Sequence, residues 1–176
     1  YRAPREINWM VGMCLLIATL STGFTGYSLV FEQLSFWGAT VGANIADSTP
    51  LIGPFVKNMM LGGSTYNQAT LSRFYVIHAA ILPVTIVLLV VVHITIIRLQ
   101  GVTEFEFEDE NVGEKKTFSF LPEHFYTELM IGLMLMVVLS ALATIFPATL
   151  GPVADPLVTP EVIKPEWLFY VEFRWL

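Results

Sequence analysis

The chain has 176 residues, of which 55% are hydrophobic and only 14% are charged, with a net charge of −6. A soluble domain carries roughly 25% charged residues, so this composition leaves too few charges to cover a surface in water. The acidic balance argues against a nucleic-acid partner, which needs a basic face. The single cysteine, Cys14, excludes a disulfide framework or a cysteine-based metal site within the chain.

Three apolar segments are long enough to span a bilayer, which takes about 20 residues. They cover residues 8–30, 74–97 and 129–146, and a further apolar segment begins near Trp167. The predicted fold class is therefore all-α: a polytopic membrane helix bundle with three complete transmembrane helices and the start of a fourth. Membrane lipid is the expected surrounding medium.

The connections between these segments differ in composition. Residues 31–72 mix polar and apolar residues, and the stretches 33–46 and 51–60 are predicted to form short helices at the membrane interface. Residues 101–126 begin with an acidic run that predicts a solvated loop, and residues 147–165 contain five prolines, which predict a rigid, shaped loop. The Lys and Arg bias predicts that the first and last of these connections share the positive face.

His78 and His93 are 15 residues apart on the second predicted span. In an α-helix they would lie roughly 60° apart around the axis and about 22 Å apart along it, one toward each leaflet. Ionisable residues at membrane depth are costly and usually functional. The pair either hydrogen-bonds neighbouring helices or provides one axial ligand to each of two haems. His124 is placed in a loop, so two bis-histidine haems would need ligands from another segment. Pro83, between the pair, predicts a kink.

Several short segments occur in order along the chain: Tyr1-Arg-Ala-Pro-Arg-Glu6, Gly26-Tyr27, Gln33-Leu-Ser-Phe-Trp-Gly-Ala-Thr-Val41, Ala69-Thr-Leu-Ser-Arg-Phe-Tyr75, Pro156-Leu-Val-Thr-Pro160 and Lys164-Pro-Glu-Trp167. Together they resemble the cytochrome b family, from the approach to its third transmembrane helix to the start of its sixth. The resemblance implies that residues 1–100 belong to the haem-binding N-terminal domain. Residues 101–126 would form an acidic negative-side loop, and residues 127–176 would belong to the C-terminal domain.

The resemblance implies two haem b groups. His78 would ligate the iron near the positive side and His93 the iron near the negative side. The second axial ligands would come from the segment that carries the family's first two helices, which is absent here. Arg73, just before His78, is also expected to bind a cofactor.

The resemblance also implies a quinol-oxidation site on the positive face. Glu166 would accept a quinol proton; the alternative is a surface glutamate in a loop. Two departures from the family pattern reshape this pocket: Leu168 replaces the motif's tyrosine, and Val30-Phe31 replaces the usual Pro-Trp. The other residues expected at this site are Tyr27, Phe36, Gly38, Pro165 and Trp167.

A quinone-reduction site on the negative face would use Arg98 and Glu128. Each has a second interpretation from the residues alone. Arg98 could extend to lipid headgroups, and Glu128 could be a charge that the helix dipole favours at an N-terminus.

The implied activity is that of a quinol:cytochrome c or plastocyanin oxidoreductase subunit, active only within its complex. Quinol oxidation, electron transfer through two haems and quinone reduction would be coupled to proton translocation. The expected partners are a Rieske iron–sulfur protein and a cytochrome c-type subunit in a homodimeric complex, in a bacterial cytoplasmic membrane. The alternative is a non-redox transporter or anchor subunit that uses the membrane histidines as a proton relay, which predicts no visible absorbance.

Overall fold

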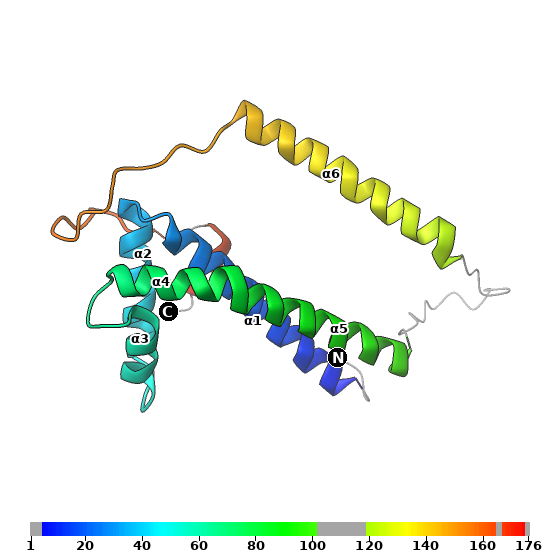
Figure 1. Cartoon of the computed structure of the whole chain (residues 1–176), viewed down its shortest axis with the longest axis horizontal. Coiled ribbons are helices and arrows are strands. Elements are labelled where there is room, and N and C mark those ends of the chain that lie inside the picture. Colours follow the sequence, from blue (N-terminus) through cyan, green and yellow to red (C-terminus); the bar gives the residue numbers. More distant parts are fainter. Residues whose placement is uncertain (1–4, 102–118, 165–166, 175–176) are drawn as a thin grey trace. The chain divides into compact units, whose positions relative to one another are not determined.

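The computed structural model describes residues 5–101, 119–164 and 167–174 (Figure 1). The helices are α1 (Glu6–Leu29), α2 (Gln33–Asp47), α3 (Gly53–Leu61), α4 (Gln68–Val76), α5 (Leu82–Gln100), α6 (Phe125–Ile145) and α7 (Tyr170–Arg174). Short π-helical turns cover Ile77–Ile81 and Phe120–His124, and a 3-10 turn covers Trp167–Phe169. The described parts of 1–102 and 151–176 form one compact unit, and those of 103–150 form another.

Three of these helical stretches are long and apolar enough to cross a membrane: Glu6–Leu29, Gln68–Gln100 and Phe120–Ile145. The predicted all-α membrane bundle is therefore confirmed, and the protein is an integral membrane protein. Apolar side chains on these helices point outward, as a lipid-facing surface requires; Leu88 on α5 is 61% exposed. The division into family domains stays a prediction, and most of the expected acidic loop (102–118) lies outside the described residues.

The second span is longer than its apolar run because polar residues begin it. Asn67 Oδ1 accepts a hydrogen bond from Ala69 N–H at 2.7 Å, and Thr70 Oγ1 accepts one from Asn67 N–H at 3.0 Å. Such an N-cap satisfies backbone donors that have no partner within the helix. The helix therefore starts at Gln68, ahead of the apolar residues that predicted it.

Pro83 lies inside the second span, where it lacks an N–H and its ring opposes the preceding turn. The helix widens into the π-helical turn Ile77–Ile81 just before it, and α5 then continues to Gln100. A π turn accommodates the mismatch by shifting the hydrogen-bond register. His78 lies within this turn.

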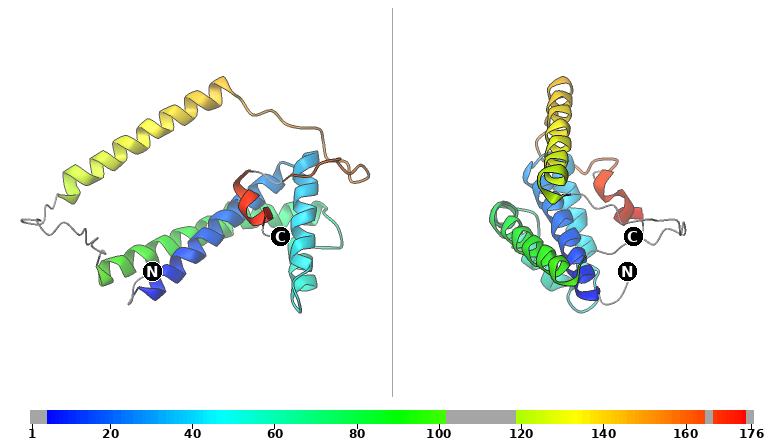
Figure 2. Two further views of the ribbon diagram at one scale, coloured as in Figure 1. Left: turned by 180° about the vertical axis from the view of Figure 1, so that it is seen from behind. Right: turned by 90° about the vertical axis from the view of Figure 1, so that its right-hand side faces the viewer.

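Helices α2 and α4 pack against α1, and α3 packs against α2 and α4; α2 lies across the C-terminal end of α1 (Figures 1 and 2). The buried core here consists of Phe36, Ala39, Ala43, Leu61, Tyr66 and Phe74. Tyr66 is its centre: its ring lies 5.2 Å from that of Phe36, and its hydroxyl donates to the Ser28 carbonyl at 2.7 Å. Burial raises the pKa of Tyr66 to about 12.

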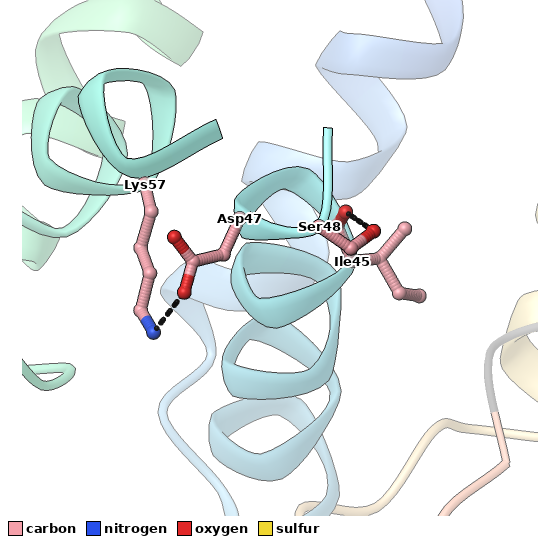
Figure 3. Close-up of polar contacts among 4 residues, drawn as sticks. All are labelled: Ile45, Asp47, Ser48 and Lys57. Carbon is pink, nitrogen blue, oxygen red and sulfur yellow. Dashed lines mark hydrogen bonds and ion pairs between the residues drawn. The ribbon is translucent and has the colours of Figure 1, made fainter. Parts of the chain in front are cut away.

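The turn between α2 and α3 is closed by polar contacts (Figure 3). Lys57 Nζ lies 3.0 Å from Asp47 Oδ2, and Ser48 Oγ donates to the Ile45 carbonyl at 2.7 Å. A Cβ at Gly53 would lie 2.0 Å from the Asp47 carbonyl oxygen, so this approach requires glycine. The two short interfacial helices predicted from the sequence are thus present and packed together.

Candidate functional site

His78 lies in the π-helical turn Ile77–Ile81, and its ring faces α1. Its Nδ1 is 3.1 Å from the Thr22 carbonyl oxygen and 3.2 Å from Thr25 Oγ1. A carbonyl oxygen can only accept, so Nδ1 carries the proton and Nε2 keeps its lone pair. Metal-ligating histidines are held in this way, with the second ring nitrogen donating to a backbone carbonyl. The imidazole is therefore in the tautomer that an iron ligand at Nε2 requires.

His93 lies on the same side of α5, facing α1 near that helix's start. A Cβ at Gly12 of α1 would lie 3.6 Å from His93 Cε1. Within the described part of the chain, His93 Nδ1 is buried and has no hydrogen-bond partner. An orphaned buried nitrogen is costly unless another group satisfies it. Both histidines therefore lie on one side of the second span, turned toward α1.

Two glycines opposite the histidines were missed by sequence reasoning. A Cβ at Gly26 would lie 2.7 Å from His78 Cε1, closer than a real Cβ approaches. Gly12 occupies the matching place beside His93. The two glycines are 14 residues apart on one span, and the two histidines are 15 residues apart on the other. This similar spacing could have indicated that each glycine lies opposite a histidine. Small residues at helix interfaces allow close approach in membranes.

No cluster of three or more His, Cys, Asp or Glu side chains suited to a metal ion occurs among the described residues. Each imidazole of the second span offers one nitrogen donor, a ligand that suits a haem iron.

Two residues predicted for the positive-face site, Tyr27 and Gly38, lie side by side, because a Cβ at Gly38 would lie 3.4 Å from Tyr27 Cε1. A third, Phe36, is 5% exposed and packs against the rings of Phe31 and Tyr66. Gly42, one turn further along α2, faces the ring of Phe24 in the same way. Small residues on α2 thus allow the end of α1 to pack closely.

Arg73 adopts a role that the sequence did not reveal. Its Nη1 donates to the carbonyls of Asn58 (3.2 Å) and Met59 (2.7 Å) at the end of α3. A cation here satisfies carbonyls that lack helical partners and opposes the helix dipole. α3 ends at Gly62 with a φ of 70°, the left-handed conformation that glycine adopts without strain.

Of the proline-rich loop motif, Pro165 and Glu166 lie outside the described residues. Trp167 is described and is 74% exposed. Just beyond it, the ring of Phe169 packs edge-on against that of Phe24, with centroids 6.3 Å apart. Upstream, residues 151–158 contact the start of α2, as described below.

The negative-face residues are placed separately. Arg98 is exposed in the last turn of α5, and the Arg5 guanidinium donates to the Gly101 carbonyl at 2.7 Å, joining the start of α1 to the end of α5. Glu128 is exposed in the first turn of α6, in the other compact unit. His124 ends the π-helical turn that leads into α6, within the helical stretch Phe120–Ile145, where the sequence predicted a loop.

A family model described as cytochrome b(N-terminal)/b6/petB matches residues 1–152. The chain belongs to this cytochrome b family. Cytochrome b of Rhodobacter capsulatus is 36% identical over 179 residues, covering 96% of this chain and 41% of that protein. Cytochrome b6 of Heliomicrobium gestii is 44% identical over 104 residues, covering 59% of this chain and 49% of that protein.

Among solved structures, a chain of a hyperthermophilic respiratory complex III superposes with a TM-score of 0.74 at 28% identity. The match covers 98% of this chain and 48% of that chain. This cytochrome b chain thus spans about half the length of the curated relatives it matches. The family resemblance predicted from short sequence segments is confirmed.

Proposed function

We propose that this chain links quinol oxidation at the positive face to quinone reduction at the negative face, within a quinol:cytochrome c or plastocyanin oxidoreductase complex. The observation that carries the proposal is the pair of imidazoles on one membrane helix, both turned toward α1, with His78 Nδ1 engaged as a donor. Two haem b groups, when bound, would supply the one-electron carriers between the two faces.

His78 and His93 would each give one ring nitrogen to a haem iron. Gly12 and Gly26 would keep the neighbouring helix close without displacing the rings. The second axial ligands would come from the cytochrome b segment that carries the first two family helices. Arg73 would remain able to bind an anionic cofactor group, because a guanidinium has five N–H donors and the two α3 carbonyls use only Nη1.

On the positive face, Glu166 would accept a quinol proton, since a carboxylate close to a dry pocket can act as general base. Tyr27, Phe36 and Gly38 would form the wall of the pocket, and Pro165 and Trp167 would bracket the base. On the negative face, Arg98 and Glu128 would bind quinone and deliver protons to it. Release on one side and uptake on the other would translocate protons.

The complex would include a Rieske iron–sulfur protein and a cytochrome c-type subunit, and we expect it to be homodimeric. Quinol gives up two electrons, and the haem near the positive face would take only one of them at a time. A one-electron iron–sulfur acceptor for the other electron therefore fits the chemistry.

The test is a reduced-minus-oxidised visible spectrum of the purified complex, compared among the parent, His78→Leu, His93→Leu and His124→Leu. We expect two b-type haems in the parent and in the His124→Leu control, which alters a histidine that the proposal does not assign to an iron. Each of the other variants should lose one haem. A parent complex without b-type absorbance would instead support the non-redox transporter or anchor, and equal haem in all variants would refute the ligand assignment.

A further inference from the structure

The start of α2 is joined to the proline-rich segment through two adjacent residues. Gly151 N–H donates to Glu32 Oε2 at 2.5 Å, and Gln33 N–H donates to the Pro152 carbonyl at 2.9 Å. Glu32 and Val153 also form an isolated antiparallel bridge. The main chain of residues 151–153 is therefore held against the first turn of α2.

The side-chain amide of Gln33 contacts both ends of the turn formed by residues 155–158. Its Oε1 accepts from Asp155 N–H at 2.6 Å, and its Nε2 donates to the Val158 carbonyl. Within the turn, Asp155 Oδ1 accepts from Leu157 N–H at 2.9 Å. A primary amide offers both an acceptor and donors, so one glutamine can hold an N–H and a carbonyl of the same turn. Neither an aliphatic side chain nor a carboxylate can make both contacts.

These contacts precede the motif Lys164-Pro-Glu-Trp167 along the chain. On the other side, the ring of Phe169 packs edge-on against that of Phe24 on α1. The motif is thus bracketed by an attachment to α2 and an attachment to α1. Both attachments are to elements that also carry the aromatic cluster of the proposed quinol pocket.

We propose that Gln33, with Glu32 beside it, is a positioning residue for quinol oxidation: the pair holds residues 151–158 on the start of α2, next to the aromatic cluster of the proposed quinol pocket. The inference rests on the proposed function of that site. Neither residue need touch quinol. The effect follows from geometry, because a displacement of about 1 Å at a reacting centre can cost about 10²-fold in rate.

The decisive variant is Gln33→Met, which keeps the length of the side chain and removes both polar contacts. Its matched control is Asn44→Leu, which removes an exposed amide from the same helix. In the intact complex, we expect Gln33→Met to lower kcat per haem and raise KM for quinol, with kcat/KM reduced roughly 10- to 100-fold. Re-oxidation of chemically reduced haem by quinone at the negative face should stay at the parent rate.

A conservative variant separates positioning from general stability. Gln33→Glu keeps an acceptor for Asp155 N–H and loses the donor to Val158, so it should fall between Gln33→Met and the parent. A merely structural role predicts less haem per complex with kcat per haem and KM unchanged. Hydrogen exchange provides a second measurement: the Asp155 amide should be protected in the parent and exchange faster in Gln33→Met, while Gly151 keeps its protection.

The role is wrong if Gln33→Met matches Asn44→Leu in both kcat per haem and KM. It is also wrong if the Asp155 amide of the parent complex exchanges as fast as an exposed amide, a result that requires no variant to assemble. A parent complex that oxidises no quinol would refute the proposed function itself, and the exchange of Asp155 would still report whether the contact between α2 and the segment exists.

Discussion

A methyl group at Gly26 would enter the space of the His78 ring. Its Cβ would lie 2.7 Å from Cε1 and 3.2 Å from Nδ1, so the ring must move. Moving the ring forces the side chain away from its rotamer, which costs about 0.5–1.5 kcal/mol. It also breaks the bond to the Thr22 carbonyl, worth about 0.5–1.5 kcal/mol. We therefore expect Gly26→Ala to weaken haem retention at His78 by about 1–3 kcal/mol, roughly 5- to 150-fold.

Gly12→Ala is the matched control, because a Cβ there would lie 3.6 Å from His93 Cε1, an ordinary contact. Haem content and a redox titration of the visible spectrum of the intact complex measure both variants. Gly26→Ala should lose or shift one haem, and Gly12→Ala should titrate like the parent. If Gly26→Ala keeps both haems with unchanged midpoints, or if the two variants behave alike, the close packing of His78 on α1 does not position it.

Three further predictions concern other residues. Tyr66→Phe leaves the Ser28 carbonyl without its donor and should lower the free energy of unfolding by about 1–3 kcal/mol, measured by thermal melting of the complex. In the parent, the stability from neutral, buried Tyr66 is full below pH 10 and is lost as pH rises through about 12; Tyr66→Phe should lack this alkaline loss in melting curves. Glu166→Gln should slow quinol oxidation by part of the 10²–10⁴-fold range of general base catalysis, less at high pH, in a steady-state assay that leaves haem content unchanged.

The helices were predictable because the membrane imposes simple requirements on composition. Apolar runs of spanning length identified all three spans, and polar punctuation identified α2 and α3 to within about two residues. The boundaries that differed are those set by polar residues. Asn67 caps the second span ahead of the apolar run that predicted it. The π turn at Ile77–Ile81 accommodates Pro83, so the helix continues through it.

The contacts between distant segments were not predictable, because no local pattern encodes them. Gln33 and Val158 are 125 residues apart, and the amide that joins them resembles any polar residue at the start of a helix. Arg73 is predicted to bind a cofactor, and no local pattern indicated that its guanidinium also caps α3 through Asn58 and Met59. The position of Gly26 opposite His78 could have been predicted only by comparing the glycine spacing on the first span with the histidine spacing on the second.

The hydroxyl groups of α1 bear on whether His78 is an iron ligand or part of a proton relay. Thr25 Oγ1 donates to the Ser21 carbonyl at 2.8 Å, which leaves its oxygen lone pairs to accept from His78 Nδ1–H. The Thr22 carbonyl is the second acceptor for the same N–H. A relay histidine must release the proton of one nitrogen and regain it at the other. The Thr22 carbonyl has no proton, and the Thr25 hydroxyl proton is held by the Ser21 carbonyl, so neither group returns a proton to Nδ1 and only Nε2 is left to react. A fixed tautomer suits a permanent bond to a metal, and it favours the haem ligand over the relay.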